Sequence, residues 1–208
     1  MSEQVADPSD GRIRRGDRTR RLVLGRAVDV ASVDGLDGLS IGRLATELSI
    51  SKSGLIAHFG TKEQLQLATI RAARAIFAAT VVAPALEQPP GLGRLRALLD
   101  AWLEYSSDRQ FPGGCFFARA THEFAARPGP VRDALAAADL EWLGLITRTI
   151  VEAQEVGEIR PDVDAGQLAF DLAAYLDSAN LRSLLLGTFE VYDQAREALE
   201  RRLEESSS

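Results

Sequence analysis

Residues 40–65, SIGRLATELSISKSGLIAHFGTKEQL, decide the fold of this 208-residue chain. Apolar side chains recur at helical spacing from Ile41 to Leu48, and Ser40 in front of them is a good N-cap. Residues 49–51 interrupt this pattern, and a second short helix is expected over residues 52–58. Residues 61–64, TKEQ, form a capping box that opens a third helix. The segment therefore predicts a helix-turn-helix.

The second helix of this motif has two different faces. Leu55, Ile56 and Phe59 point toward the first helix, while the opposite face carries small, polar or basic residues. A helix needs such residues if its backbone is to approach a DNA groove. The residues predicted to meet DNA on this face are Ser51, Lys52, Ser53, Gly54 and His58. The alternative is a helical hairpin whose polar residues are only solvated.

The order of motifs around this segment resembles one family. A long first helix is followed by S-I-x-x-L-A, then S-x-S-x-L-x-x-H-F, then T-K-E-x-L. This order resembles the N-terminal domain of TetR-type transcriptional regulators over about residues 18–67. Many members carry Tyr just before the His-Phe pair, where this chain has Ile56 and Ala57. The aromatic phosphate contact of those members therefore has no counterpart here.

The charge distribution agrees with DNA binding although the whole chain carries a net charge of −6. Residues 11–26 hold seven arginines and one aspartate, so positive charge is concentrated beside the motif. Binding to DNA phosphates depends on this local positive charge rather than on the net charge of the whole chain. Arg14, Arg15 and Arg18 are predicted to reach DNA, and Lys62 resembles the family's backbone-contact lysine. Ser40 completes the predicted DNA-binding set.

No segment shows the alternation of a β-strand, so the chain is predicted to be all-α with about nine helices. We expect a flexible basic arm over residues 1–16, a three-helix DNA-binding head over 17–65 and a larger helical body over 66–208. Prolines and glycines separate the expected helices, which cover residues 17–34, 61–83, 92–109, 115–126, 130–156, 165–186 and 190–205 besides the two of the hairpin.

Composition narrows the class of protein further. We find no apolar stretch near the roughly 20 residues of a membrane span, and the charged N-terminus lacks the apolar core of a secretory signal. The single cysteine, Cys115, excludes an internal disulfide framework. These features predict a cytoplasmic protein that does not bind membranes.

No catalytic or metal-binding constellation is found in the sequence. Cys115 and His122 lie on one helix face, but two helical turns separate them by about 10 Å, too far for direct contact. No second His or Cys near His122 completes a metal site, and no glycine-rich phosphate loop follows a strand. We therefore predict neither a cofactor nor catalysis.

The body contains many large side chains, and each of them is either core or part of a pocket between helices. Small-molecule sites are usually apolar with a few polar groups. The resemblance to TetR-type regulators implies an effector site in the body. The predicted pocket residues are Trp102, Tyr105, Phe116, Phe117, His122, Trp142 and Phe170, with Thr121, Glu123, Asp177, Ser178 and Asn180 as further polar candidates.

The last two helices are predicted to form a homodimer interface. The helix over 165–186 is apolar around most of its circumference, which indicates burial on both sides. In TetR-like proteins these helices pair with their mates as a four-helix bundle. The predicted interface residues are Leu168, Leu172, Leu176, Tyr192, Leu199 and Leu203. Packing within one chain is the alternative.

Together these features predict a dimeric regulator, most simply a repressor, that binds palindromic double-stranded operator DNA and a small, largely apolar effector. Two other classes stay open. One is an all-α enzyme that uses His122 and nearby carboxylates, and the other is an interaction module without DNA binding.

Overall fold

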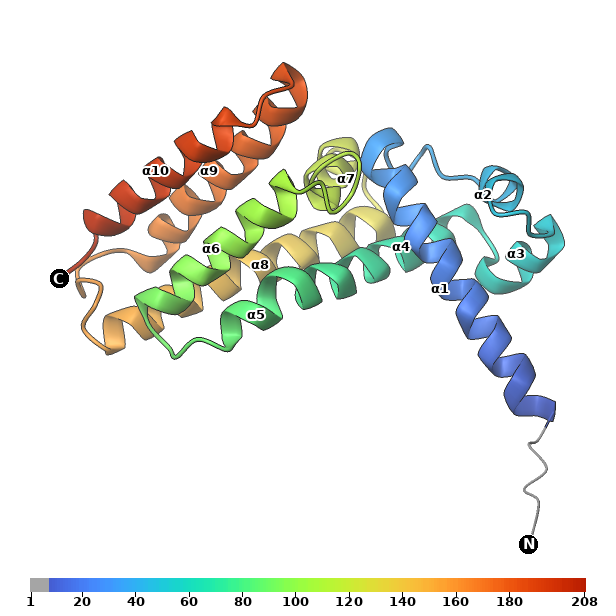
Figure 1. The fold of residues 1–208 in the computed structure, drawn as a ribbon, viewed down its shortest axis with the longest axis horizontal. Helices are drawn as coiled ribbons and strands as arrows, with labels where there is room; N and C mark the ends of the chain where they lie inside the picture. Colours follow the sequence, from blue (N-terminus) through green and yellow to red (C-terminus); the bar gives the residue numbers. More distant parts are fainter. Residues whose placement is uncertain (1–7) are drawn as a thin grey trace, which may run out of the picture.

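A computed structural model describes the backbone of residues 8–208 and the side chains from Gly16 onward, and it is helical almost throughout (Figure 1). The elements are α1 (Pro8–Asp34), α2 (Ile41–Glu47), α3 (Lys52–Phe59), α4 (Lys62–Phe77), the π-helical turn η1 (Ala78–Val82), α5 (Ala83–Leu86), α6 (Leu92–Ser107), α7 (Phe116–Phe124), α8 (Pro130–Glu155), α9 (Ala165–Leu186) and α10 (Glu190–Glu204).

Because α4, η1 and α5 form one continuous rod over Lys62–Leu86, the described residues contain nine separate helical rods. The only β contact among them is an isolated bridge between Ile159 and Ser207. The predicted all-α class and the three-helix head with a larger body are therefore confirmed.

The head consists of α1, α2, α3 and the start of α4 (Figure 1). Ser40 caps α2 by accepting a hydrogen bond from the N–H of Arg43 at 3.0 Å. Thr61 and Gln64 exchange the two hydrogen bonds of the predicted capping box at the start of α4. Between the two hairpin helices, Ser49 takes a positive φ of 54°, which turns the chain sharply. The helix-turn-helix is therefore fixed by local side-chain caps.

α1 begins at Pro8, nine residues before the predicted start at residue 17. Proline suits the first turn of a helix, and arginine is a good helix former. Extending an existing helix is also much easier than nucleating one, and the part of α1 around Val23 to Ala31 is packed into the core. The packed half therefore supports a polar extension that has no apolar pattern of its own.

The rod over Lys62–Leu86 runs past Pro84, where the sequence pattern predicts a break after residue 83. Proline lacks an N–H and its ring collides with the carbonyl one turn earlier in a regular α-helix. Here the five-residue π-helical turn η1 precedes it, and the N–H of Ala83 bonds to the carbonyl of Ala78. The wider turn changes the backbone register ahead of Pro84, which lets the rod continue.

By length and composition alone, this rod is also apolar enough to cross a membrane, although no stretch of that length is predicted from the sequence. A core helix of a globular domain passes the same test, and the rod packs against α1, α6 and α8. Packing inside this fold therefore accounts for the 39% of the apolar window that is buried.

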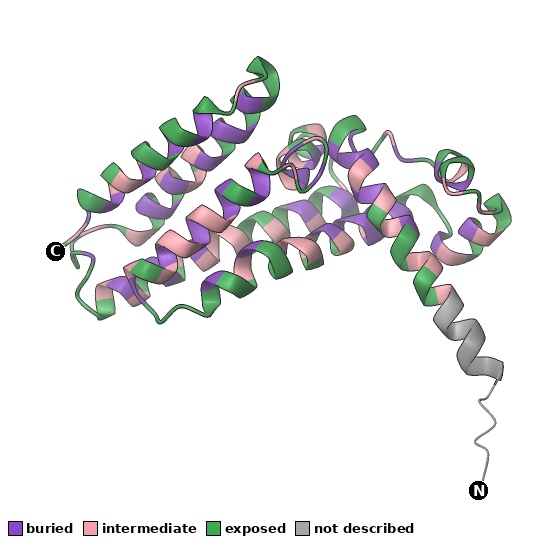
Figure 2. Cartoon of the chain, in the orientation of Figure 1, coloured by how far each residue is buried: buried purple, intermediate pink, exposed green. Residues whose placement is uncertain are grey.

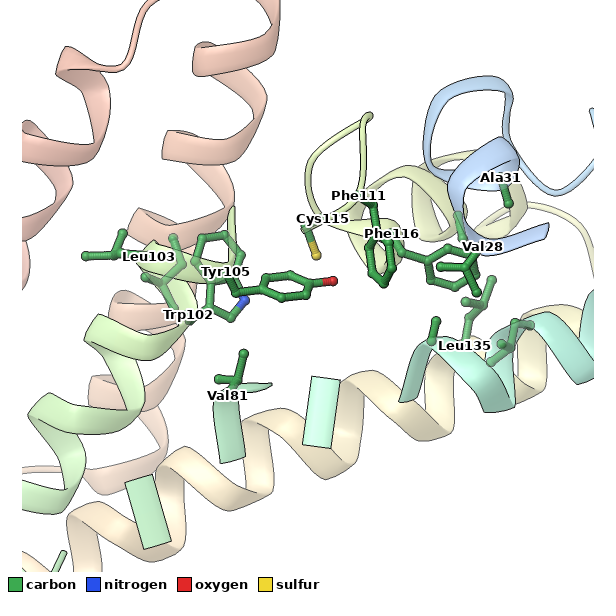
Figure 3. Close-up of a cluster of buried hydrophobic side chains, with 14 of the residues drawn as sticks. Val28, Ala31, Val81, Trp102, Leu103, Tyr105, Phe111, Cys115, Phe116 and Leu135 are labelled. Carbon is green, nitrogen blue, oxygen red and sulfur yellow. The ribbon is translucent and has the colours of Figure 1, made fainter. Parts of the chain in front are cut away.

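The body is an array of long helices in which α8 packs on α4, α6 and α9, and α9 packs on α10 (Figures 1 and 2). Aromatic side chains fill the junction between α6, α7 and the head, as the close-up of Tyr105, Phe111 and Phe116 shows (Figure 3). The ring of Tyr105 meets Phe111 edge to face at 5.9 Å. Dense aromatic packing at this junction holds α7 between the body and α1.

Candidate DNA-binding and effector sites

The start of α3 presents the predicted DNA-contacting residues to solvent. Ser51 caps the helix by accepting a hydrogen bond from the N–H of Gly54 at 3.1 Å, and Lys52 and Ser53 are exposed beside it. Leu55 and Phe59 are buried on the other side, against α2 and α4. The exposed end therefore combines a positive side chain, a hydroxyl and the N–H groups of a helix N-terminus, which suit an anionic backbone. Ile56, predicted to pack inward, is instead 47% exposed.

An arginine that the sequence pattern does not single out holds α3 in place. Arg20 of α1 donates a hydrogen bond to the carbonyl of His58 at 2.9 Å, and its guanidinium lies 4.9 Å from the ring centre of Phe59. His58 itself is half-buried, so part of its ring is occupied with packing. Arg18 is exposed on the same helix, whereas the side chains of Arg14 and Arg15 lie outside the described residues.

Lys62 takes part in a charged network at the base of the head. Its ammonium donates to the carbonyl of Asp37 at 2.7 Å and lies 3.4 Å from the Asp37 carboxylate. Arg127 also pairs with Asp37, and the hydrogen bonds from Arg127 and Lys62 lower the pKa of that carboxyl. Lys62 is exposed, so a phosphate that contacts it competes with Asp37.

The body contains a cavity of about 1200 Å³ between the α4–α5 rod, α6, α7, α8 and α9. Five predicted pocket residues line it, namely Trp102, Phe117, His122, Trp142 and Phe170. The other two do not: Phe116 is fully buried in the core, and Tyr105 is buried with its hydroxyl near Cys115 and Phe116. The apolar pattern identifies large side chains on the right helices but does not distinguish those that face a void from those that face another helix.

Charged residues also line the cavity, and most of them are not in the predicted set. The charged residues that line the cavity are Arg71, Arg74, Asp139, Glu141, Arg148 and Asp177, of which only Asp177 is among the predicted polar candidates. Arg74 forms an ion pair with Glu141. Burial raises the pKa of the Asp177 carboxyl, the charge of Asp139 raises it further, and His122 lowers it. Asp177 is an exposed residue, so solvent still reaches its carboxyl although neighbouring protein atoms partly desolvate it.

The remaining polar candidates have other positions. Asn180 is buried and accepts hydrogen bonds from the N–H of Cys115 at 2.9 Å and from the hydroxyl of Ser106 at 3.0 Å, which makes it structural. Ser178 borders a shallower groove of about 350 Å³ between α9 and α10. Cys115 is buried, and burial raises the pKa of its thiol to about 11, so the reactive thiolate form is scarce at neutral pH.

Glu123 connects the cavity wall to the head. Its carboxylate accepts hydrogen bonds from the backbone N–H groups of Leu36, at 2.7 Å, and Asp37, at 2.9 Å, in the turn between α1 and α2. The two preceding residues of α7, Thr121 and His122, line the cavity. One short helix therefore touches the cavity with one face and the DNA-binding head with the other.

All six residues predicted to form the dimer interface are buried within a single chain, between α9, α10 and their neighbours: Leu168, Leu172, Leu176, Tyr192, Leu199 and Leu203. Their assignment to a subunit interface is therefore corrected to the intrachain core. The apolar surface lies elsewhere on the same helix, at Leu181, Leu184, Leu185, Leu186 and the adjoining Phe189, which are 43–76% exposed. A helix that is apolar all round does not reveal which side its own chain covers.

Fold and site thus define a helix-turn-helix DNA-binding protein with a separate helical ligand-binding body. Family comparisons agree with this class. Residues 23–69 match the model of bacterial regulatory proteins of the TetR family, and residues 91–199, more than half of the chain, match the tetracycline repressor-like C-terminal domain. The chain belongs to the TetR family of transcriptional regulators. A search of curated protein sequences gives no significant match.

Solved structures show the same fold over nearly the whole chain. A TetR transcriptional regulator from Chloroflexus aurantiacus J-10-FL is 26% identical, with a TM-score of 0.86 over 93% of this chain and 98% of that one. A regulator from Saccharomonospora viridis, solved in complex with choline, is 25% identical, with a TM-score of 0.76 over 92% and 98%. AibR, solved with isovaleryl coenzyme A and operator DNA, is 23% identical, with a TM-score of 0.64 over 77% and 85%, and shares the fold.

Proposed function

We propose that this regulator is a homodimeric repressor that binds palindromic operator DNA and leaves it when a small molecule fills the cavity. The observation that carries the proposal is the shared rod: the same α4–α5 helix packs against α1 and α3 of the head and lines the cavity from Arg71 to Leu86. Ligand contacts on this rod act on the element that sets the position of α3. Such a protein acts where the DNA is, inside the cell.

In the proposed complex, the N-terminal end of α3 enters the major groove, and Lys52 and Ser53 contact base edges or phosphates. Ser40 and Lys62 contact the backbone, and Arg14, Arg15 and Arg18 extend the contact along α1. Exposed Lys52 and the arginine-rich half of α1 support this orientation. The missing tyrosines at Ile56 and Ala57 remove one phosphate contact and leave the others in place.

Two recognition helices can contact the same face of the DNA only if two chains form a dimer. The exposed leucines of α9, above all Leu181 and Leu185, supply an apolar surface for a second copy. In a two-fold dimer the half-sites would lie about 34–36 Å apart. The ligand releases DNA only if it binds the DNA-incompetent arrangement more tightly than the DNA-bound one. By reciprocity, DNA lowers the affinity for the ligand by the same factor.

The test is selection of DNA by the full-length protein from a random duplex library, followed by fluorescence anisotropy on the enriched sequence. We expect an inverted repeat and an affinity that falls steeply with salt, because phosphate contacts release counterions. Absence of enrichment, or binding that salt does not weaken, would favour an interaction module without DNA binding. Transcription in vitro from a promoter that overlaps the selected site then shows whether the protein lowers or raises transcription. If adding the protein increases the amount of transcript, the protein is an activator and not a repressor.

A further inference from the structure

The exposed face of α3 carries a large apolar side chain, Ile56. Its neighbours Leu55 and Phe59 are buried against α2 and α4, whereas Ile56 is 47% exposed. Because the three residues belong to one short helix, α3 could turn Ile56 inward only by taking Leu55 and Phe59 out of the core. The packing of the helix-turn-helix therefore directs Ile56 to the surface.

Contacts at both ends of α3 fix this orientation. Arg20 of α1 donates a hydrogen bond to the carbonyl of His58 at 2.9 Å, and its guanidinium lies 4.9 Å from the ring centre of Phe59. At the other end, Ser51 caps the first turn through a hydrogen bond of 3.1 Å. The β-branched side chain of Ile56 is itself restricted in its first torsion within a helix. A contact through Ile56 therefore orders few additional degrees of freedom.

The residues that share this face with Ile56 are small. Ser53 and Ala57 are exposed, and their spacing places them on the same side of the helix as Ile56. Gly60 follows α3 with a φ of +65°, and a Cβ atom there would collide with the side chain of Gln64. Small neighbours let the backbone of α3 come close to a partner, so Ile56 can reach into a groove.

The charge of this surface favours a polyanion as the partner. Residues 48–62 contain two lysines, both exposed, and no carboxylate. The acidic residue just before this stretch, Glu47, forms ion pairs with Arg26 at 2.7 Å and Arg43 at 2.8 Å. An apolar side chain between free lysines fits DNA, which offers phosphates beside apolar groups of the bases.

Thymine is the base that presents an apolar group in the major groove. Its C5-methyl group projects there, and apolar side chains contact it. Burying a methyl group against Ile56 removes apolar surface from water on both sides of the contact. Cytosine lacks this methyl group, and the side chain of isoleucine offers no hydrogen bond that would replace the lost contact.

We infer that Ile56 is a specificity-determining residue, which contacts the C5-methyl group of a thymine in each half-site of the operator. The inference rests on the proposed function, because it requires α3 in the major groove. It adds the chemical identity of one base, which Lys52 and Ser53 do not specify. The apolar pair Ile56–Ala57, where many family members carry tyrosine, is then a feature of sequence recognition in this chain.

The test removes the methyl group alone. In the operator selected by the full-length protein, each thymine is replaced in turn by deoxyuridine, in both half-sites at once. Deoxyuridine keeps the hydrogen-bonding groups of thymine. Fluorescence anisotropy at constant salt measures the affinity of each duplex. At one thymine position, we expect the affinity of the wild type to fall about tenfold, because each of the two lost methyl contacts contributes about threefold to fourfold.

Variants assign this effect to Ile56. Ile56→Ala should bind the thymine and deoxyuridine operators equally at the sensitive position. Val33→Ala is the matched control, because Val33 is also β-branched and 50% exposed but lies at the end of α1, where the backbone of Gly113 approaches it. It should keep the full effect of the methyl group. Circular dichroism checks that both variants are folded.

The outcomes separate this inference from the proposed function. If the protein binds its operator but every methyl effect persists in Ile56→Ala, the proposed function stands and this inference is overturned. A selected half-site without thymine has the same consequence. A protein that binds no DNA overturns both proposals.

Discussion

The carboxylate of Glu123, on α7, accepts a hydrogen bond from the backbone N–H of Leu36 at 2.7 Å, across the boundary between the body and the DNA-binding head. The neighbouring Gly35 has a φ of +78°, and a Cβ atom there would collide with the same carboxylate. The turn after α1 is therefore shaped around Glu123. Any ligand that displaces α7 changes the support of this turn.

Replacing Glu123 with alanine should uncouple the cavity from DNA. The variant leaves two backbone N–H groups without their acceptor, so we expect a loss of about 1–3 kcal/mol in the free energy of unfolding of the head. We also expect a smaller ratio between the operator affinities with and without effector. Fluorescence anisotropy with and without ligand measures the ratio. Glu155→Ala, an exposed change at the far end of α8, is the control, and an unchanged ratio in Glu123→Ala would exclude this route.

Lys52→Ala and Lys62→Ala should differ in their effect on sequence preference. Each removes one predicted phosphate or base contact, so the slope of log affinity against log salt should flatten by roughly one unit in each variant. Only Lys52, at the tip of α3, should also alter the selected sequence. The exposed Arg160, far along the chain from the head, provides the control Arg160→Ala. Affinity that survives the double alanine variant would contradict the proposed orientation on DNA.

Leu185→Glu should prevent dimer formation. Leu185 is 76% exposed in one chain, and burying an unpaired carboxylate against a second copy would cost several kcal/mol. Analytical ultracentrifugation should show a dimer for the wild type and a monomer for the variant. Val156→Glu alters a similarly exposed apolar residue at the end of α8 and should remain dimeric. A wild type that sediments as a monomer at micromolar concentration removes the dimer from the proposal.

Much of the fold follows from the sequence because its determinants are local. Ser40 and Thr61 cap helices through residues three positions away, and Gly91 and Gly129 stand directly before the first residues of α6 and α8. The continuation past Pro84 does not follow, since it depends on a π-helical turn that leaves no simple pattern.

The sites were harder to predict because their geometry depends on distant contacts. The hydrogen bond between Glu123 and Leu36 joins residues that are 87 positions apart, and no local sequence pattern around Glu123 predicts it. Likewise Leu176 and Leu185 look equivalent in an apolar helix, yet the first is buried in its own chain and the second is exposed. Periodicity gives the helix, while the side that each residue faces depends on how the helices pack.

Two buried tyrosines provide a matched test of the hydrogen-bond network in the body. The hydroxyl of Tyr192 contacts Ser106 at 2.8 Å, Ser183 at 2.9 Å and Arg109 at 3.1 Å, whereas the hydroxyl of Tyr105 has no partner among the described residues. Tyr192→Phe should lower the free energy of unfolding by about 1–3 kcal/mol, and Tyr105→Phe should leave it unchanged or raise it slightly. Urea denaturation measures both. A larger loss for Tyr105→Phe would indicate a partner for its hydroxyl that these contacts do not include.

Asp177→Asn should stabilise the ligand-free protein in a pH-dependent way. Burial and the charge of Asp139 raise the pKa of Asp177 above its ordinary value of 3.8, so the folded state binds this proton more tightly than the unfolded state. The resulting destabilisation is absent below the unfolded pKa, grows as the pH rises through the interval between the two pKa values, and is constant above the folded one. The melting temperature of Asp177→Asn should therefore exceed that of the wild type at pH 7–8, and the difference should shrink as the pH falls toward about 4. Thermal unfolding across this range, with Asp133→Asn as the control, checks the sign. A variant that is less stable than the wild type at pH 7–8 would mean that other groups of the protein compensate the charge of the Asp177 carboxylate.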